Sequence, residues 1–252
     1  MWNGDYRFLL HNLIAKDFKV RYRNMSLGMF WSLLNPLVTM GVLTFVFTKF
    51  LPNKNIKHYP LFFLCGLIPY NFFVLAWSTG TSSLADNANL IKRVAVPREI
   101  IPIATVLGNS LHLLIQVALL LVFALYGGQG VNRYWAWLPV IWTMEVVLVC
   151  GLSLISSAVN VYVRDTRYLV ESFNAVLFWL VPIVYQFPSP QYSAMYSLNP
   201  VAALVMALRD ILLDGKPPAA SLLVKLSLGS IAVLGLGVLL FRRMKRNFYD
   251  YL

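Results

Sequence analysis

The sequence predicts an all-α integral membrane protein, and three observations lead to this fold class. Hydrophobic residues make up 59% of the 252 residues, and charged residues only 12%, where soluble domains typically have roughly 25%. Apolar runs recur along the chain, and several of them are about 20 residues long, the length that a helix needs to cross a bilayer. Such a chain lacks the polar residues to cover a soluble domain and is too apolar for intrinsic disorder.

Residues 5–24 predict an amphipathic helix that precedes the first apolar run. Apolar side chains recur there at helical spacing, at Tyr6, Leu9, Leu10, Leu13, Ile14 and Phe18, and therefore share one face. Basic side chains occupy much of the remaining surface. A basic amphipathic helix next to a membrane span is typical of the membrane interface, and the alternative is a peripheral helix packed on protein.

Six apolar stretches are then predicted to cross the membrane, and no soluble domain fits beside them, so residues 1–252 form a single transmembrane domain. The spans are 28–49, 61–84, 100–126, 135–163, 168–185 and 219–241. The segment 186–218 is proline-rich, and its apolar part, 201–213, is too short to cross. Such a piece is more typical of a re-entrant or interfacial segment.

The placement of basic residues predicts the orientation. With both termini on one side, that side carries 14 Lys and Arg residues and the opposite side six. Because cytoplasmic loops are enriched in Lys and Arg, both termini are expected in the cytoplasm. The formal charge of +11 is thereby explained without a nucleic-acid partner.

The connection 85–99 is the strongest candidate for a contact with a soluble partner. Asp86 is expected to cap a short helix, in which Leu90 and Ile91 supply an apolar contact and Lys92 and Arg93 a charged edge. Pro97 is expected to stop or restart the helix. The alternative is a solvated basic loop on the lipid surface.

Chemistry-bearing motifs are absent from the sequence. No phosphate-binding loop, dinucleotide loop or nucleophile elbow is present, and His11, His58 and His112 have no metal-ligand spacing. Cys65 and Cys150 lie in apolar runs and are expected to be free, buried thiols. We therefore expect no catalytic residue, no metal and no cofactor in this chain.

Ionisable and aromatic residues inside the spans have two interpretations each. Glu145 and Lys225 are costly in lipid and thus candidates for function, although pairing with neighbours or snorkelling explains them equally well. Aromatic rings inside the spans could line a path along which the apolar C–H faces of a glycan move. The alternative is that these rings pack in the core or against lipid.

Four segments, read in order, carry a family resemblance. They are RYRNMSLGMFWSLLNPLVTMGVLTFVF at 21–47, NLIKRVAVPREIIPIA at 89–104, NVYVRDTRYLVE at 160–171 and SLNPVAALVMALRDILLDG at 197–215. On these motifs, and over nearly its whole length, the chain resembles the permease subunits of ABC exporters for bacterial surface polysaccharides, within the type-2 ABC exporter superfamily.

The resemblance implies the partners and the substrate. Two copies of this subunit would form a homodimeric channel in the inner membrane, and two copies of a separate ABC ATPase, which binds ATP and Mg, would dock beneath it. The substrate would be a lipid-linked glycan such as O antigen, capsule or teichoic acid polymer. Membrane lipid is the remaining partner.

The resemblance also implies three sets of site residues. The ATPase-coupling set is Asp86, Asn89, Leu90, Ile91, Lys92, Arg93, Pro97, Arg98, Arg164 and Asp165. The translocation-path set is Phe30, Trp31, Phe45, Phe178, Trp179 and Tyr185. The outer-gate set is Pro188, Pro190, Asn199, Pro200, Arg209 and Asp210. A plain solvated ion pair of Asp165 with Arg164 or Arg167 remains the alternative for that turn.

Two other function classes remain open at this stage. A drug or small-lipid exporter of the same superfamily would share the fold and differ only in substrate. An integral membrane enzyme acting on lipid-linked sugar is less favoured, because the acid/base or metal constellation that it needs is missing from the sequence.

Overall fold

The computed structural model describes residues 5–22, 30–50, 58–93, 96–127, 130–186, 199–245 and 248. All regular secondary structure in this part of the chain is helical, which confirms the all-α class. The elements are α1 (Tyr6–Tyr22), α2 (Phe30–Phe45) with a π-helical turn (Val46–Phe50), α3 (Tyr59–Asp86), α4 (Ala88–Arg93), α5 (Ile100–Tyr126), a 3₁₀ turn (Arg133–Trp137), α6 (Leu138–Tyr162), α7 (Thr166–Leu180), α9 (Pro200–Leu212) and α10 (Ala220–Met244).

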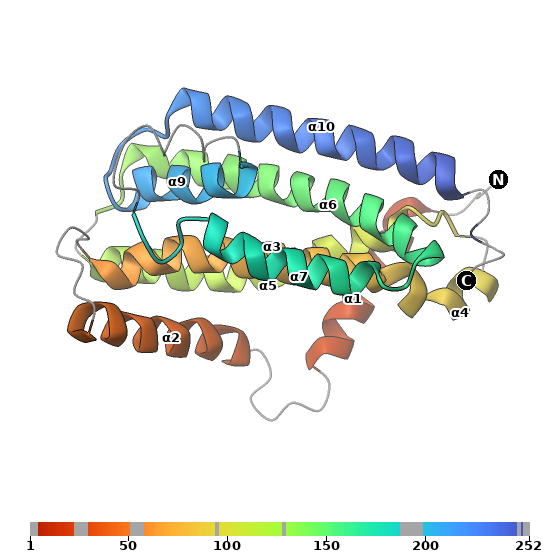
Figure 1. The fold of residues 1–252 in the computed structure, drawn as a ribbon, viewed down its shortest axis with the longest axis horizontal. Helices are drawn as coiled ribbons and strands as arrows, with labels where there is room; N and C mark the ends of the chain where they lie inside the picture. Colours follow the sequence, from red (N-terminus) through yellow and green to blue (C-terminus); the bar gives the residue numbers. More distant parts are fainter. Residues whose placement is uncertain are drawn as a thin grey trace.

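Four long helices, α3, α5, α6 and α10, run along the long axis of the molecule (Figure 1). The main apolar core lies between them and α9, and α3 contributes most of its first half to it. Glycines let α6 and α10 approach closely: a Cβ on Gly237 would lie 2.5 Å from the carbonyl oxygen of Gly151. The crossing therefore depends on the absence of side chains there.

Within the described part of the chain, five helical segments are long and apolar enough to cross a membrane: Leu33–Phe50, Tyr59–Asp86, Ile100–Tyr126, Arg133–Tyr162 and Ala220–Met244. They correspond to five of the six predicted spans. Only 22% of the most apolar stretch of α10 and 6% of Leu33–Phe50 are buried within the chain, so these two helices expose apolar surface that lipid or another subunit must cover.

The predicted span 168–185 is wrong at its end, because the helix is shorter than the apolar run. α7 has 15 residues and stops at Leu180, a length of about 22 Å. The following residue, Val181, is extended with ψ 133°, as expected for a residue that precedes a proline. Pro182 thus ends the helix although the sequence remains apolar.

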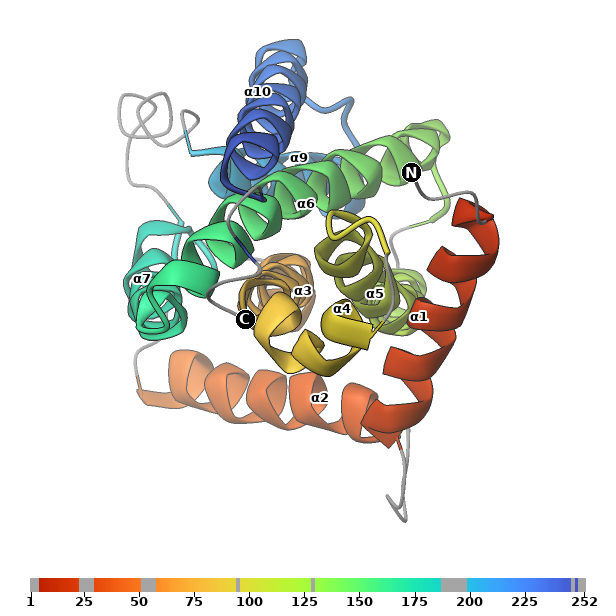
Figure 2. The same ribbon diagram turned by 90° about the vertical axis from the view of Figure 1, so that its right-hand side faces the viewer.

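The two ends of the bundle have different elements. α1 and α4 lie at one end, together with the α6–α7 turn and the last turn of α10, and α1 runs across the bundle axis (Figures 1 and 2). At the other end lie the α5–α6 connection and the end of α9. Since α6 and α10 run in the same direction, the chain has to return between them, and α7 is the first part of that return.

α1 corresponds to the predicted amphipathic helix, and most of its apolar side is covered by protein, whereas Tyr6 at its start is exposed. Leu13 is buried, and Leu9, Leu10 and Ile14 pack against the same apolar cluster. The packing contacts are mainly with α5. For this face the structure favours the alternative of a helix packed on protein, while Phe8 and other side chains of α1 remain exposed.

Candidate functional site

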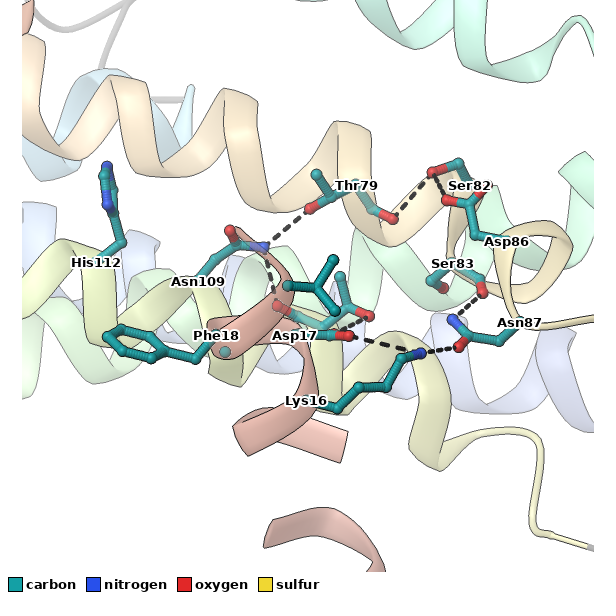
Figure 3. Close-up of a pocket in the computed structure, with 13 residues that line it drawn as sticks. Lys16, Asp17, Phe18, Thr79, Ser82, Ser83, Asp86, Asn87, Asn109 and His112 are labelled. Carbon is teal, nitrogen blue, oxygen red and sulfur yellow. Dashed lines mark hydrogen bonds and ion pairs between the residues drawn. The ribbon is translucent and has the colours of Figure 1, made fainter. Parts of the chain in front are cut away.

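The end of the molecule that holds α4 is organised around Asn87, the residue between α3 and α4. Its backbone carbonyl accepts hydrogen bonds from the amides of Leu90 and Ile91, and its side-chain nitrogen donates to the carbonyl of Ser83 at 2.8 Å. Lys16 of α1 donates to Asn87 Oδ1 at 2.6 Å (Figure 3). The junction of α3 and α4 is therefore tied to α1.

The expected capping role of Asp86 is wrong. Asp86 is the last residue of α3, and its carboxylate accepts a hydrogen bond from Ser82 Oγ, one turn earlier, at 2.7 Å. Asn87 occupies the junction instead, and its amide side chain, which has both a donor and an acceptor, donates to α3 and accepts from α1.

α4 has one buried side and one exposed edge. Ile91 is 5% exposed and lies in an apolar cluster with Leu84, Ile101 and Phe241, and Leu90 packs partly against that cluster. Asn89, Lys92 and Arg93 are exposed. Of the predicted coupling residues on α4, Ile91 and Leu90 thus attach the helix to the bundle, and the other three form its outward polar edge.

Pro97 and Arg98 follow α4 and are half-buried. Arg98 Nη1 donates to the carbonyl oxygen of Lys245 at 2.8 Å. The Lys245 ammonium forms an ion pair with Glu99 at 3.2 Å. These contacts attach the segment after α4 to the last turn of α10, so Arg98 does not belong to the outward edge formed by α4.

The α6–α7 turn lies beside the α3–α4 junction. Arg164 and Arg167 line a cavity of about 260 Å³ together with Asp86 and Asn160, so the structure brings both predicted coupling regions together. Arg164 and Asp165 are exposed. The alternative of an Asp165 ion pair finds no support, because the three ion pairs among the described residues do not include it. Arg167 stacks on the ring of Tyr168 at 4.5 Å.

The predicted path residues divide by exposure. Phe30, Trp31, Phe45 and Trp179 are between 52% and 71% exposed. Phe178 is half-buried and packs edge-on against Tyr70 at 5.5 Å. Tyr185 donates to the carbonyl of Trp179 at 2.6 Å. Both α2 and α7 flank α3, on two adjoining sides of the bundle (Figure 2).

At the opposite end, α9 is capped at its start and is held to α3 and to the residues after α7. Asn199 caps it by accepting the amide of Val201 at 3.1 Å, and Pro200 begins it, as is common at this position. The guanidinium of Arg209 donates to the carbonyls of Ile183, at 2.9 Å, and Phe62, at 3.3 Å. The same group lies 3.4 Å from the centre of the Phe62 ring.

The placement of α9 follows from its neighbours along α10. A Cβ on Gly229 would lie 3.9 Å from Pro200, whereas the Asp210 carboxylate accepts from the amide of Ala219, so α9 runs antiparallel to the first half of α10. Burial raises the pKa of the Asp210 carboxyl above its ordinary value. The predicted gate residues Pro188 and Pro190 lie outside the described residues.

The two ionisable residues in the spans have different surroundings. Glu145 is buried in α6 at 1% exposure, whereas Lys225 is exposed on α10. Cys65 and Cys150 are both free and buried, which confirms the expectation of unpaired thiols.

The contribution of α1 to this site was not predicted from the sequence. Lys16 entered only as a positive charge, and Asn87 as one residue of the connection. Their hydrogen bond joins positions 71 residues apart, and neither residue has a local pattern that predicts it. The one clue to this contact in the sequence was that both residues are predicted to lie on the same side of the membrane.

An all-helical bundle whose long helices are apolar enough to cross a membrane, with a short amphipathic helix at one end and a capped helical segment at the other, defines a multi-pass integral membrane protein. The comparison with protein families agrees: residues 9–213 match the ABC-2 type transporter family. The chain belongs to this family, and the resemblance in its four motifs is thereby confirmed.

Individual relatives extend over almost the whole chain. An O-antigen export system permease protein of Klebsiella pneumoniae is 29% identical and aligns over 100% of this chain and 98% of the relative. A protein of the same description from Myxococcus xanthus is 28% identical, over 98% and 96%. A polysialic acid transport protein of Escherichia coli is 22% identical, over 91% of each chain.

Proposed function

We propose that this chain is the transmembrane subunit of an ATP-driven exporter that moves a lipid-linked O antigen across the inner membrane of a bacterium. The observation that carries the proposal is the end-to-end similarity to O-antigen export permeases at 28–29% identity, in a chain whose sequence has no phosphate-binding loop. The energy would come from two ATPase subunits on the cytoplasmic side, where both termini of this chain would also lie.

The exposed polar edge of α4 is where the ATPase would dock. Asn89, Lys92 and Arg93 are exposed on a helix whose other side is buried. Arg164 and Asp165 add an exposed second contact close by. A push on α4 would reach the bundle directly, since Ile91 packs among residues of α3, α5, α6 and α10.

The test is co-purification with the candidate ATPase and measurement of glycan-stimulated ATP hydrolysis. Reversing both charges on α4, in Lys92→Glu with Arg93→Glu, should abolish co-purification while membrane insertion persists. Arg242→Glu with Arg243→Glu is the matched control, because these residues are exposed at the same end on α10. Equal loss in both double variants, or none in the α4 variant, would overturn the docking site.

The translocation path would form between two copies of the chain. Exposed aromatic residues lie along α2 and α7, among them Phe30, Trp31, Phe173 and Trp179. Two α2–α7 faces from a symmetric dimer would enclose a path lined by rings, against which the apolar faces of sugars can slide. α9, packed beside the outer half of α10, would be the re-entrant gate.

A capsular polysaccharide is the second candidate substrate, and the similarity to polysialic acid transport proteins favours it. That similarity is weaker, at 22% identity, than the 29% with the O-antigen permeases. Complementation of strains that lack one or the other permease distinguishes the two substrates. Restored capsule without restored O antigen would replace the first substrate by the second.

A further inference from the structure

A polar cleft lies between α1, α3 and α5, away from the aromatic α2–α7 face. Its volume is about 420 Å³, within the range of small-molecule sites in proteins. It reaches from Asp86 and Asn87, beside the α3–α4 junction, to His112, the thirteenth residue of α5. Figure 3 shows side chains of all three helices converging on it.

An unpaired acceptor is buried in this cleft. Asn109 is 1% exposed, and its side-chain nitrogen donates to Thr79 Oγ1 and to the carbonyl of Thr105, both at 2.9 Å. Its Oδ1 has no hydrogen-bond partner within the described part of the chain. A buried amide oxygen without a partner costs about 1–3 kcal/mol, so a donor supplied from outside would bind there favourably.

The charges of the cleft select the kind of ligand. The charged groups that line it are the carboxylates of Asp17 and Asp86 and the ammonium of Lys16. Lys16 is already engaged with Asn87 and lies 4.0 Å from Asp17. Since acceptors and negative charge prevail, the cleft disfavours phosphate and favours a neutral ligand that offers several hydroxyl donors.

Other lining groups complete a surface suited to sugar. Hydroxyl groups of Thr79, Ser82 and Thr105 line the cleft and are able to exchange hydrogen bonds with sugar hydroxyls. Phe18 contributes an aromatic ring, and such rings pack against the C–H face of a sugar. Carboxylate, amide, hydroxyl and aromatic groups are thus gathered within one cavity.

We propose that the α1–α3–α5 cleft binds a neutral sugar unit of the glycan at the membrane side where α4 lies, before the glycan enters the path. The inference rests on the proposed function and adds a recognition site to it. A sugar in the cleft would touch α1 and the last turns of α3 at once. Binding of the sugar would therefore affect the position of Asn87, the residue directly before α4.

Photo-crosslinking in cells that carry the ATPase and make the glycan tests the proposal. A benzophenone amino acid is placed at Val20, which lines the cleft and is 62% exposed, or at Phe8, which lies on the same helix outside the cleft and is 69% exposed. Irradiation should attach a glycan ladder to the Val20 variant, detected with a glycan-specific antiserum, and attach only phospholipid to the Phe8 variant.

Two matched substitutions provide a second measurement. Asp17→Asn removes a charged acceptor from the cleft, whereas Asp5→Asn makes the same change at the start of α1, where asparagine also caps a helix well. In the purified complex, Asp17→Asn should raise the concentration of lipid-linked glycan for half-maximal ATPase stimulation about tenfold. Asp5→Asn should leave that concentration unchanged.

The outcomes separate this inference from the function on which it rests. Equal glycan labelling at Val20 and Phe8, or phospholipid alone at both while surface glycan is still exported, would overturn the sugar site and leave the exporter intact. An unchanged half-maximal concentration in Asp17→Asn would also overturn it. Loss of the proposed function itself would appear differently, as no surface glycan with the unmodified chain.

Discussion

Lys16 of α1 donates a 2.6 Å hydrogen bond to Asn87, the residue between α3 and α4. It thereby connects the helix that lies across the bundle with the helix proposed to receive the ATPase. Motion of α4 would be passed to α1 through this contact. Because Lys16 is exposed, the bond contributes to stability by no more than about 1 kcal/mol, so its removal can be studied in a folded protein.

Lys16→Met is expected to reduce glycan export several-fold with little change in melting temperature, because it removes the link and keeps the length of the side chain. Asn87→Ala should have the same effect, and the double variant should be no worse than either single one. Export rate and melting temperature are measured on the same preparations. Additive losses in the double variant would show that the two residues act separately.

The α6–α10 crossing predicts a contrast between two glycines on α10. Gly237→Ala should destabilise the protein by about 1–3 kcal/mol, since the added Cβ would lie 2.5 Å from the carbonyl oxygen of Gly151. Gly235→Ala should be neutral or slightly stabilising, because its Cβ position meets no described atom within 4 Å apart from the backbone of its own helix and its chain neighbours. Thermal unfolding in detergent compares them, and equal melting temperatures would contradict the packing argument.

Arg209 is expected to be essential for holding α9. Arg209→Met withdraws donors from the carbonyls of Phe62 and Ile183 and should lower stability by about 3 kcal/mol, with new protease cleavage near α9. Lys216→Met, which breaks the exposed ion pair with Asp214, is the control and should change stability by less than about 1 kcal/mol. Similar melting temperatures for both variants would show that the Arg209 contacts do not hold α9 in place.

The proposed dimer predicts selective disulfide crosslinking. Cysteine placed at Phe173, Val176 or Trp179, on the exposed side of α7, should give a covalent dimer in membranes for at least one position. Cysteine at Val224 or Leu228, exposed on α10, should give none. Cys65 and Cys150 are buried and contribute little background. Crosslinks found only at the α10 positions would show that the second copy contacts α10 and not α7.

Leu90→Asp is expected to disturb the packing of α4 as well as its contact with the ATPase. From sequence, Leu90 is a contact for the ATPase, and the variant is expected to stop export without affecting folding. In the structure Leu90 packs partly against the cluster around Ile91, so an aspartate there would also disturb the attachment of α4. The exposed Lys92 and Arg93 separate docking from folding more cleanly.

Sequence by itself determined the fold class and most of the membrane segments. The span 100–126 coincides with α5, and α3 and α10 differ from their predicted spans by two or three residues at most. The physical reason is that an apolar run in lipid satisfies its backbone polar groups within its own helix. Hydropathy along the chain therefore predicts each helix without knowledge of its neighbours.

Local chemistry explains the one span that was predicted too long. Pro182 restricts Val181 to an extended conformation, and α7 ends at Leu180 while the hydropathy stays high. Pro182 is visible in the sequence, but the predicted end of the span followed the apolar composition of the run and not the proline. Geometry of the backbone, not hydrophobicity, decides the length of this helix.

Only the tertiary structure decided which polar groups meet. Lys16 and Asn87 are 71 positions apart, and Arg209 and the carbonyl of Phe62 are 147 apart. Their contacts depend on the order and rotation of helices, which close packing such as that of Gly151 on Gly237 sets. Hydropathy is a one-dimensional property, whereas the cleft between α1, α3 and α5 exists only once those helices are packed together.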